Sequence, residues 1–338
     1  MVVLLETHEA YLDHDPGFGH PERADRLRAV RAGADAAGLG SDLVAVTPRP
    51  ATRAELERVH PADFLDDLDA FCHSGRRVID ADTRVSDGSW DAALLAAGAG
   101  LDAAERLVRG EGDAAFCAVR PPGHHASGRR AMGFCLLNNV AVTAAALADA
   151  GSRVAIVDYD VHHGNGTQAI FWDDPRVLYV SLHEFGPTAY PWTGALDDVG
   201  SEQGEGTTVN LPFPSGTAGE AFRAAFDKVV APAVGRFAPD WMLMSAGFDA
   251  HHDDPLAELV LSSGDFGDLT ARLAAMAPTG RTIAFLEGGY DLVALGTSVA
   301  ACVGALGGNP LAPEAPTTGS GRGLDVVDAA AKLHRLSD

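Results

Sequence analysis

Short apolar segments alternate with longer segments of helical periodicity along most of the chain. The apolar segments are rich in Val, Ile, Leu and Phe, often at consecutive positions, which is typical of parallel strands buried on both faces. The pattern predicts strands at 2–7, 114–119, 154–157, 177–182, 208–211, 241–246 and 282–286. Helical periodicity predicts helices at 22–37, 89–108, 138–148, 219–237, 265–276 and 292–306. This alternation predicts an α/β fold built on a parallel sheet.

The composition favours one large domain, because it shows no break before residue 308. We therefore expect one large domain at 1–307, of the size of a catalytic domain, and a Pro/Gly-rich tail at 308–338. Within the tail, residues 309–323 (NPLAPEAPTTGSGRG) are typical of a linker or an extended segment. Residues 324–336 are compatible with a short terminal helix.

Three features favour a reduced, cytoplasmic protein that does not enter a membrane. The four cysteines lie far apart and form no CxxC pair. The apolar segment after Met1 is too short for a signal peptide. The uncharged stretch at 292–311 is about long enough to span a bilayer. Its large apolar residues fall on one helical face, however, which favours a buried amphipathic helix.

The charge balance restricts the class of partner. The 338 residues include 25 Lys and Arg against 47 Asp and Glu, a net charge of −22 at pH 7. Direct nucleic-acid binding is therefore not expected, because it depends on clustered basic residues. The same charge would attract a basic peptide or a polyamine by long-range steering, so it does not distinguish between them.

Chemically capable residues follow several predicted strands, at the edge of the sheet where parallel α/β proteins bind ligands. They occur in five separate segments, at 120–125, 158–166, 183, 247–249 and 287–291. Because the carboxyl ends of parallel strands meet along one edge, these segments predict one shared site.

Within this set, three residues have the pattern of a catalytic metal site. Asp160 and His162 are two residues apart, so an extended chain directs both side chains to one side, together with Asp158. Asp249 follows an almost wholly apolar strand, where an acid is otherwise costly. An Asp in such a place also serves as a helix cap, but the three together favour a divalent transition metal.

His124 and His125 are adjacent, so a regular strand cannot present both to one metal ion. We interpret them as acid/base groups beside the metal, with a pair of exposed loop histidines as the alternative. Each then needs an orienting partner, and Asp158 and Asn165 lie in the neighbouring segment. An Asp partner stabilises an imidazolium, whereas an Asn partner leaves its histidine less basic.

Seven motifs together resemble the zinc-dependent histone deacetylases, and most closely their class II branch with its bacterial relatives. A first helix containing HPE at 20–22 and RL at 26–27 extends the likeness over residues 8–307. The motifs are RPPGHHA (120–126), GFCLLNN (133–139), VDYDVHHGNGT (157–167), SLH (181–183), SAGFDA (245–250), DPL (254–256) and LEGGYD (286–291).

The resemblance implies the arginase/deacetylase fold, a single eight-stranded parallel sheet flanked by helices. It also implies Zn²⁺, with Fe²⁺ as an alternative in the cell, held by Asp160, His162 and Asp249. It further implies a structural K⁺ ion. The K⁺ ligands would be Asp158, Asp160, His162, Ser181 and Leu182.

The same resemblance implies a role for each of five residues around the metal. His125 would be the general base and His124 the neighbouring electrostatic or acid group, paired with Asn165 and Asp158 respectively. Tyr290 would donate a hydrogen bond to the amide carbonyl and stabilise the tetrahedral intermediate.

A narrow channel for an acylated amine is also implied by the resemblance. Gly133, Phe134, Tyr190 and Leu256 would line it, with Tyr190 where a second Phe is usual. We expect Trp192 to narrow the mouth. Polyamine-selective relatives have an acidic residue at the position of Leu256, so the apolar side chain here favours acyl-lysine in a peptide or protein.

Several alternatives stay open at the level of the sequence. The substrate could be an acetylated polyamine or another small N-acyl amine, and a ureohydrolase is disfavoured because its DxHxD metal motif is absent. An inactive module that binds acylated ligands is disfavoured because every expected catalytic residue is present. The oligomeric state is open, with a homo-oligomer among the alternatives.

Overall fold

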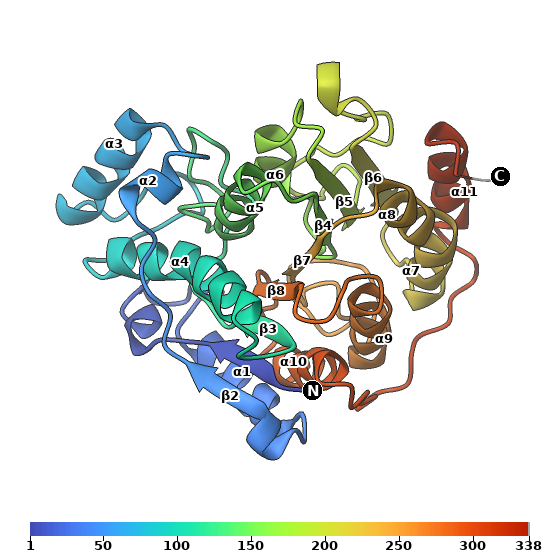
Figure 1. Cartoon of the computed structure of the whole chain (residues 1–338), viewed down its shortest axis with the longest axis horizontal. Helices are drawn as coiled ribbons and strands as arrows, with labels where there is room; N and C mark the ends of the chain where they lie inside the picture. The colour runs from blue at the N-terminus through green and yellow to red at the C-terminus, as the bar shows by residue number, and fades with distance from the viewer. Residues whose placement is uncertain (337–338) are drawn as a thin grey trace.

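The structure, a computed structural model, describes residues 1–336 and within them forms one sheet of eight parallel strands between layers of helices (Figure 1). The strand order is β2-β1-β3-β8-β7-β4-β5-β6. The strands are β1 (Val3–Glu6), β2 (Leu43–Val46), β3 (Ala114–Cys117), β4 (Val154–Asp158), β5 (Val177–Glu184), β6 (Thr208–Phe213), β7 (Trp241–Ala246) and β8 (Thr282–Leu286). This is the α/β architecture that the alternating pattern predicted.

Helices cover both faces of the sheet. The layer of α1, α10 and α9 packs on one face, and α4 with α5 packs on the other (Figure 1). The helices are α1 (Asp25–Ala36), α2 (Arg53–Leu56), α3 (Ala62–His73), α4 (Ser89–Val108), α5 (Asn139–Asp149), α6 (Asn165–Ile170), α7 (Gly219–Ala225), α8 (Ala231–Phe237), α9 (Ser263–Ala274), α10 (Leu292–Leu306) and α11 (Leu324–Leu333). Each interior strand is therefore buried on both faces, which explains its continuous apolar sequence.

The hydrophobic pattern locates seven of these strands and misses β2. That strand is at the edge of the sheet and only partly buried, and it was missed although its four residues, LVAV, are all apolar. The helix predicted at 219–237 consists of α7 and α8 joined by a π-helical turn at Phe226–Val230. Among the helices, α2, α3 and α6 were not predicted.

The helix α10 differs from the amphipathic helix that the sequence suggested, because it is buried on nearly all sides between α1 and α9. At the crossing with α1, Gly33 lies so close to the carbonyl of Gly296 that a Cβ atom on Gly33 would overlap it. No helix in the described part of the chain is long and apolar enough to cross a membrane.

The tail packs along the rest of the molecule. Residues 309–323 are irregular, as predicted, and α11 packs against β6 and α7. Glu314 accepts hydrogen bonds from the Ser263 backbone N–H at 2.9 Å and from His251 Nε2 at 2.8 Å, and Thr317 contacts Asp265. The boundary between domain and tail at residue 307 stays a prediction. The last two residues of the tail, 337–338, lie outside the described residues.

Candidate metal centre and active site

The predicted site residues come together because of the strand order. The strands β3, β8, β7, β4 and β5 are consecutive neighbours in the sheet. The segments that follow them therefore begin along one continuous stretch of the carboxyl edge. This explains how residues from 124 to 290 in the sequence surround a single cavity.

Asp160, His162 and Asp249 form a compact cluster whose ligand atoms lie within 4.8 Å of one another. His162 Nδ1 is 3.2 Å from Asp160 Oδ1 and 3.2 Å from Asp249 Oδ2. Both carboxylates are buried, and burial together with the nearby charge of Asp160 raises the pKa of Asp249. Two buried acids facing one imidazole need a compensating cation, and this donor set suits a divalent transition metal.

Backbone N–H groups hold the two carboxylates in place. Asp160 Oδ2 accepts from Gly288 N at 2.7 Å, and Asp249 Oδ1 accepts from Val161 N at 2.9 Å. A Cβ atom on Gly288 would overlap Asp249, so only glycine allows this close approach. The main chain of neighbouring segments thus fixes the positions of both carboxylates of the candidate metal cluster.

His124 has a carboxylate partner, as the sequence suggested. Its Nδ1 is 3.0 Å from Asp158 Oδ2, which also accepts a hydrogen bond from the Tyr179 hydroxyl at 3.1 Å. Burial opposes the charged form of His124, but Asp160, Asp158 and Glu287 outweigh it and raise the pKa of His124 to about 10. His124 is therefore suited to act as a cation at neutral pH.

His125 is in the opposite electrostatic situation. Its Nδ1 is 2.8 Å from Asn165 Oδ1, which can only accept, so Nδ1 carries the hydrogen and Nε2 keeps a free lone pair. Burial and repulsion from His124 and His162 lower the pKa of His125 well below its ordinary value. Two adjacent histidines thus differ in protonation, which is the arrangement expected of a general base beside a fixed positive charge.

A channel with a volume of about 220 Å³ leads to these groups. Phe134 packs edge-on against Tyr290 with ring centroids 5.8 Å apart, and Tyr190 packs edge-on against His125 at 5.1 Å. The backbone of Gly133 has φ +57°, and a Cβ atom there would overlap the His125 ring. The residues that line the channel are Asp82, His125, Gly133, Phe134, His162, Tyr190, Leu256 and Tyr290.

Tyr290 is positioned by a buried acid for which the sequence analysis gave no role. Asp254 Oδ2 accepts from Tyr290 N at 2.6 Å, and Asp254 Oδ1 accepts from Leu256 N at 3.0 Å. Asp254 therefore fixes the backbone positions of Tyr290 and of Leu256 at the channel mouth. Burial raises the pKa of Tyr290 well above its ordinary value, so its hydroxyl stays protonated and able to donate.

A buried ion-pair network contacts the loop that carries Tyr290. Arg26 donates to the carbonyls of Gly289 and Glu287, and Arg120 makes a bidentate contact with Glu22. Burial alone would raise the pKa of Glu22, but Arg120 and His14 lower it well below its ordinary range. Breaking such a buried pair costs about 3–5 kcal/mol, so the network fixes the Tyr290 loop firmly.

The loop that carries the two histidines is held by Glu287. Its Oε2 accepts from Gly123 N at 2.7 Å and from His124 N at 3.1 Å. The sequence singled out this segment but did not separate Glu287 from its neighbours. Asp82, at the channel wall, also went unnoticed, because it comes from a loop far away in the sequence.

Other residues singled out by the sequence lie outside this cavity. His183 is buried between Ser181 Oγ and the Gly194 carbonyl, and burial lowers its pKa to about 4. Trp192 packs edge-on against Tyr190 at 5.5 Å and is 64% exposed, so it extends to solvent instead of lining the channel. Of the residues implied for K⁺, Ser181 lies opposite Asp158 in the β4–β5 register, and Leu182 follows it.

Comparison with known proteins assigns this fold and site to a class of enzymes. The model of the histone deacetylase domain matches residues 20–306. A probable deacetylase of Archaeoglobus fulgidus is 39% identical over 298 residues, covering 86% of this chain and 82% of the relative. The histone deacetylase-like amidohydrolase of Pseudomonas aeruginosa is 38% identical, covering 81% of this chain and 73% of the relative.

A solved structure agrees with these relatives. The crystal structure of the HDA15 HD domain superposes with a TM-score of 0.91 at 39% identity, covering 98% of this chain and 94% of that chain. The fold and site therefore define a deacetylase of the amidohydrolase type. The chain belongs to the histone deacetylase family.

Proposed function

We propose that the protein removes acetyl or other acyl groups from lysine side chains of peptides or proteins, with Zn²⁺ at Asp160, His162 and Asp249. The observation that carries the proposal is the cavity where this cluster, the weakly basic His125 and the protonated Tyr290 hydroxyl meet. When bound, the metal would act as a Lewis acid and lower the pKa of a water molecule. The residues around it perform the remaining steps.

The protein groups divide the proton transfers among themselves. Neutral His125 accepts a proton from the attacking water at Nε2, the nitrogen that Asn165 leaves free. Tyr290 donates a hydrogen bond to the carbonyl oxygen as that oxygen gains negative charge. The charged His124, held by Asp158, stabilises the same intermediate and supports return of the proton to the leaving amine.

The channel favours acyl-lysine over a small polyamine. Leu256 is 42% exposed at the mouth and offers no negative charge to a second ammonium group. Phe134 and Tyr190 line the channel and give it aromatic surface suited to contact with an alkyl chain. The K⁺ ion implied by the family stays a proposal, supported by the proximity of Ser181 and Asp158.

Substrate choice can be tested by comparing kcat/KM for an acetyl-lysine peptide and for N-acetylputrescine on zinc-loaded enzyme. We expect the peptide to be preferred by about tenfold or more, equivalent to about 1.4 kcal/mol. The variant Leu256→Glu, which places a carboxylate at the mouth, should shift the ratio toward N-acetylputrescine. A clear preference of the unaltered enzyme for N-acetylputrescine would contradict the acyl-lysine assignment.

A further inference from the structure

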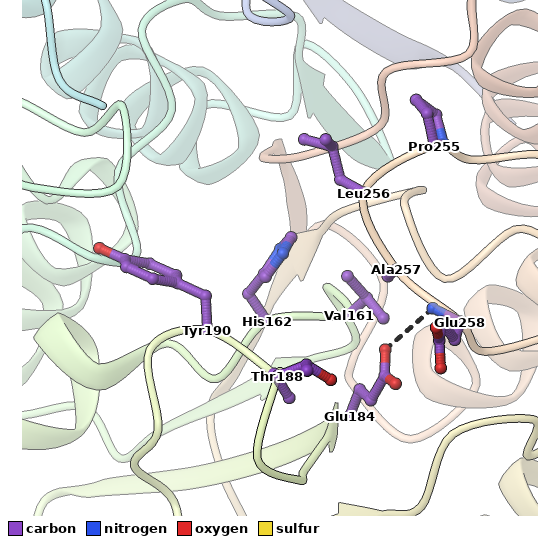
Figure 2. A pocket seen from close by; sticks show the side chains of 10 residues that line it. Val161, His162, Glu184, Thr188, Tyr190, Pro255, Leu256, Ala257 and Glu258 are labelled. Atoms are coloured by element: carbon purple, nitrogen blue, oxygen red, sulfur yellow. Dashed lines mark hydrogen bonds between the residues drawn. The ribbon is translucent and has the colours of Figure 1, made fainter. Parts of the chain in front are cut away.

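A second cavity, which we call the side pocket, lies next to the acyl channel. It has a volume of about 200 Å³ and is bounded by the end of β5 and by the segment at 255–258. His162, Tyr190 and Leu256 line both cavities, so they form the shared wall. In Figure 2, His162 lies between Tyr190 and the carboxylate of Glu184.

Glu184, the last residue of β5, provides the distinctive chemistry of the side pocket. The residue is only 9% exposed, and its Oε2 accepts a hydrogen bond from Glu258 N at 3.0 Å (Figure 2). Its Oε1 makes no hydrogen bond or ion pair with any residue that the structure describes. Burial and the nearby charge of Glu258 raise the pKa of Glu184, although the Glu258 N–H and His162 act in the opposite direction.

The remaining lining determines what could balance the charge of Glu184. The side chain of Glu258 adds a second carboxylate, and the whole lining, which falls within residues 1–336, contains no lysine or arginine. Val161, Pro255 and Ala257 give apolar walls. Glu184 is the one buried carboxylate of this lining, and the exposed Glu258 with Thr188 makes too few oxygen ligands for Ca²⁺ or Mg²⁺, which need about six or more. A buried carboxylate with apolar neighbours is a good site for an alkyl ammonium or guanidinium group.

We propose that the side pocket binds the cationic side chain of a residue that flanks the acylated lysine in a peptide substrate. This inference rests on the proposed function and adds a sequence preference to it. Tyr190 and Leu256 line both the channel and the side pocket, so an acyl-lysine in the channel would bring the neighbouring residues of its peptide close to the side pocket. Within the side pocket Glu184 is the buried acid, whereas Glu258 is exposed and Asp82 lines the channel instead.

The test uses two acetyl-lysine peptides that differ only in a flanking arginine or citrulline, which has nearly the same shape but no charge. We expect zinc-loaded enzyme to show about tenfold higher kcat/KM for the arginine peptide, mainly through KM. Glu184→Gln keeps an oxygen that accepts from Glu258 N but removes the charge, so the two peptides should become nearly equal. Glu205→Gln removes the same charge from an exposed turn outside the pocket and should retain the preference.

The proposed function and the inference about the side pocket would fail in different ways. Turnover of the citrulline peptide by Glu184→Gln reports an intact catalytic site, independently of the pocket. Equal kcat/KM for both peptides in the unaltered enzyme, or an arginine preference that survives Glu184→Gln, would overturn the inference and leave the proposed function standing. Absence of turnover with either peptide would overturn both.

Discussion

His125→Ala should reduce kcat by about 10³-fold or more while leaving the metal content unchanged. The expected loss is within the usual contribution of a general base, about 10²–10⁴-fold. His125 is bonded to Asn165 through Nδ1 and is not one of the three clustered ligands, so removing it should not release the ion. Acetate release and metal analysis on the same sample would measure both quantities.

A histidine outside the cavity provides the control for this variant. His73 is exposed near the end of α3, where its ring contacts Asp69, so His73→Ala should retain both activity and metal. If His125→Ala lost its metal, His125 would be a ligand and the assignment of the general base would be wrong.

Tyr290→Phe should lower kcat by about 10²–10³-fold, the usual cost of removing one oxyanion donor. The ring still packs against Phe134 and beneath Arg26, so the fold and the metal content should not change. Circular dichroism and metal analysis would verify this, and steady-state kinetics would give kcat.

A second tyrosine in the same channel separates the hydroxyl donor from general packing effects. Tyr190→Phe removes a hydroxyl from the channel wall, where the structure assigns it no hydrogen bond to the described residues. Its effect on kcat should be much smaller than that of Tyr290→Phe. Comparable losses in the two variants would show that Tyr290 acts through packing and not as a donor.

Much of the fold follows from the sequence because burial of a parallel sheet imposes a strong pattern. Strands such as β4 and β7 are covered on both faces, so their residues are continuously apolar and easily identified. The edge strand β2 and the acidic helix α3 were not predicted, although β2 is wholly apolar and α3 has Leu65, Leu68 and Cys72 buried at helical spacing.

The candidate site also contains residues that the sequence predicted and residues that it did not. The candidate metal ligands and the two histidines could be proposed from their residue types, from their place after strands and from family motifs. Asp254, Glu287 and Glu184 were not assigned roles, because each acts through contacts with segments far away in the sequence. Nothing in the residues around Glu184 indicates that a cavity lies beside it.

Metal reconstitution tests the central claim most directly. Enzyme stripped with a chelator and dialysed should release no acetate from an acetyl-lysine peptide. Activity should return in proportion to added Zn²⁺ and saturate at one ion per chain, and an Asp249→Ala enzyme should not recover under the same conditions. Full activity in the stripped enzyme, or recovery of Asp249→Ala to the level of the unaltered enzyme, would contradict a metal-dependent mechanism at Asp160, His162 and Asp249.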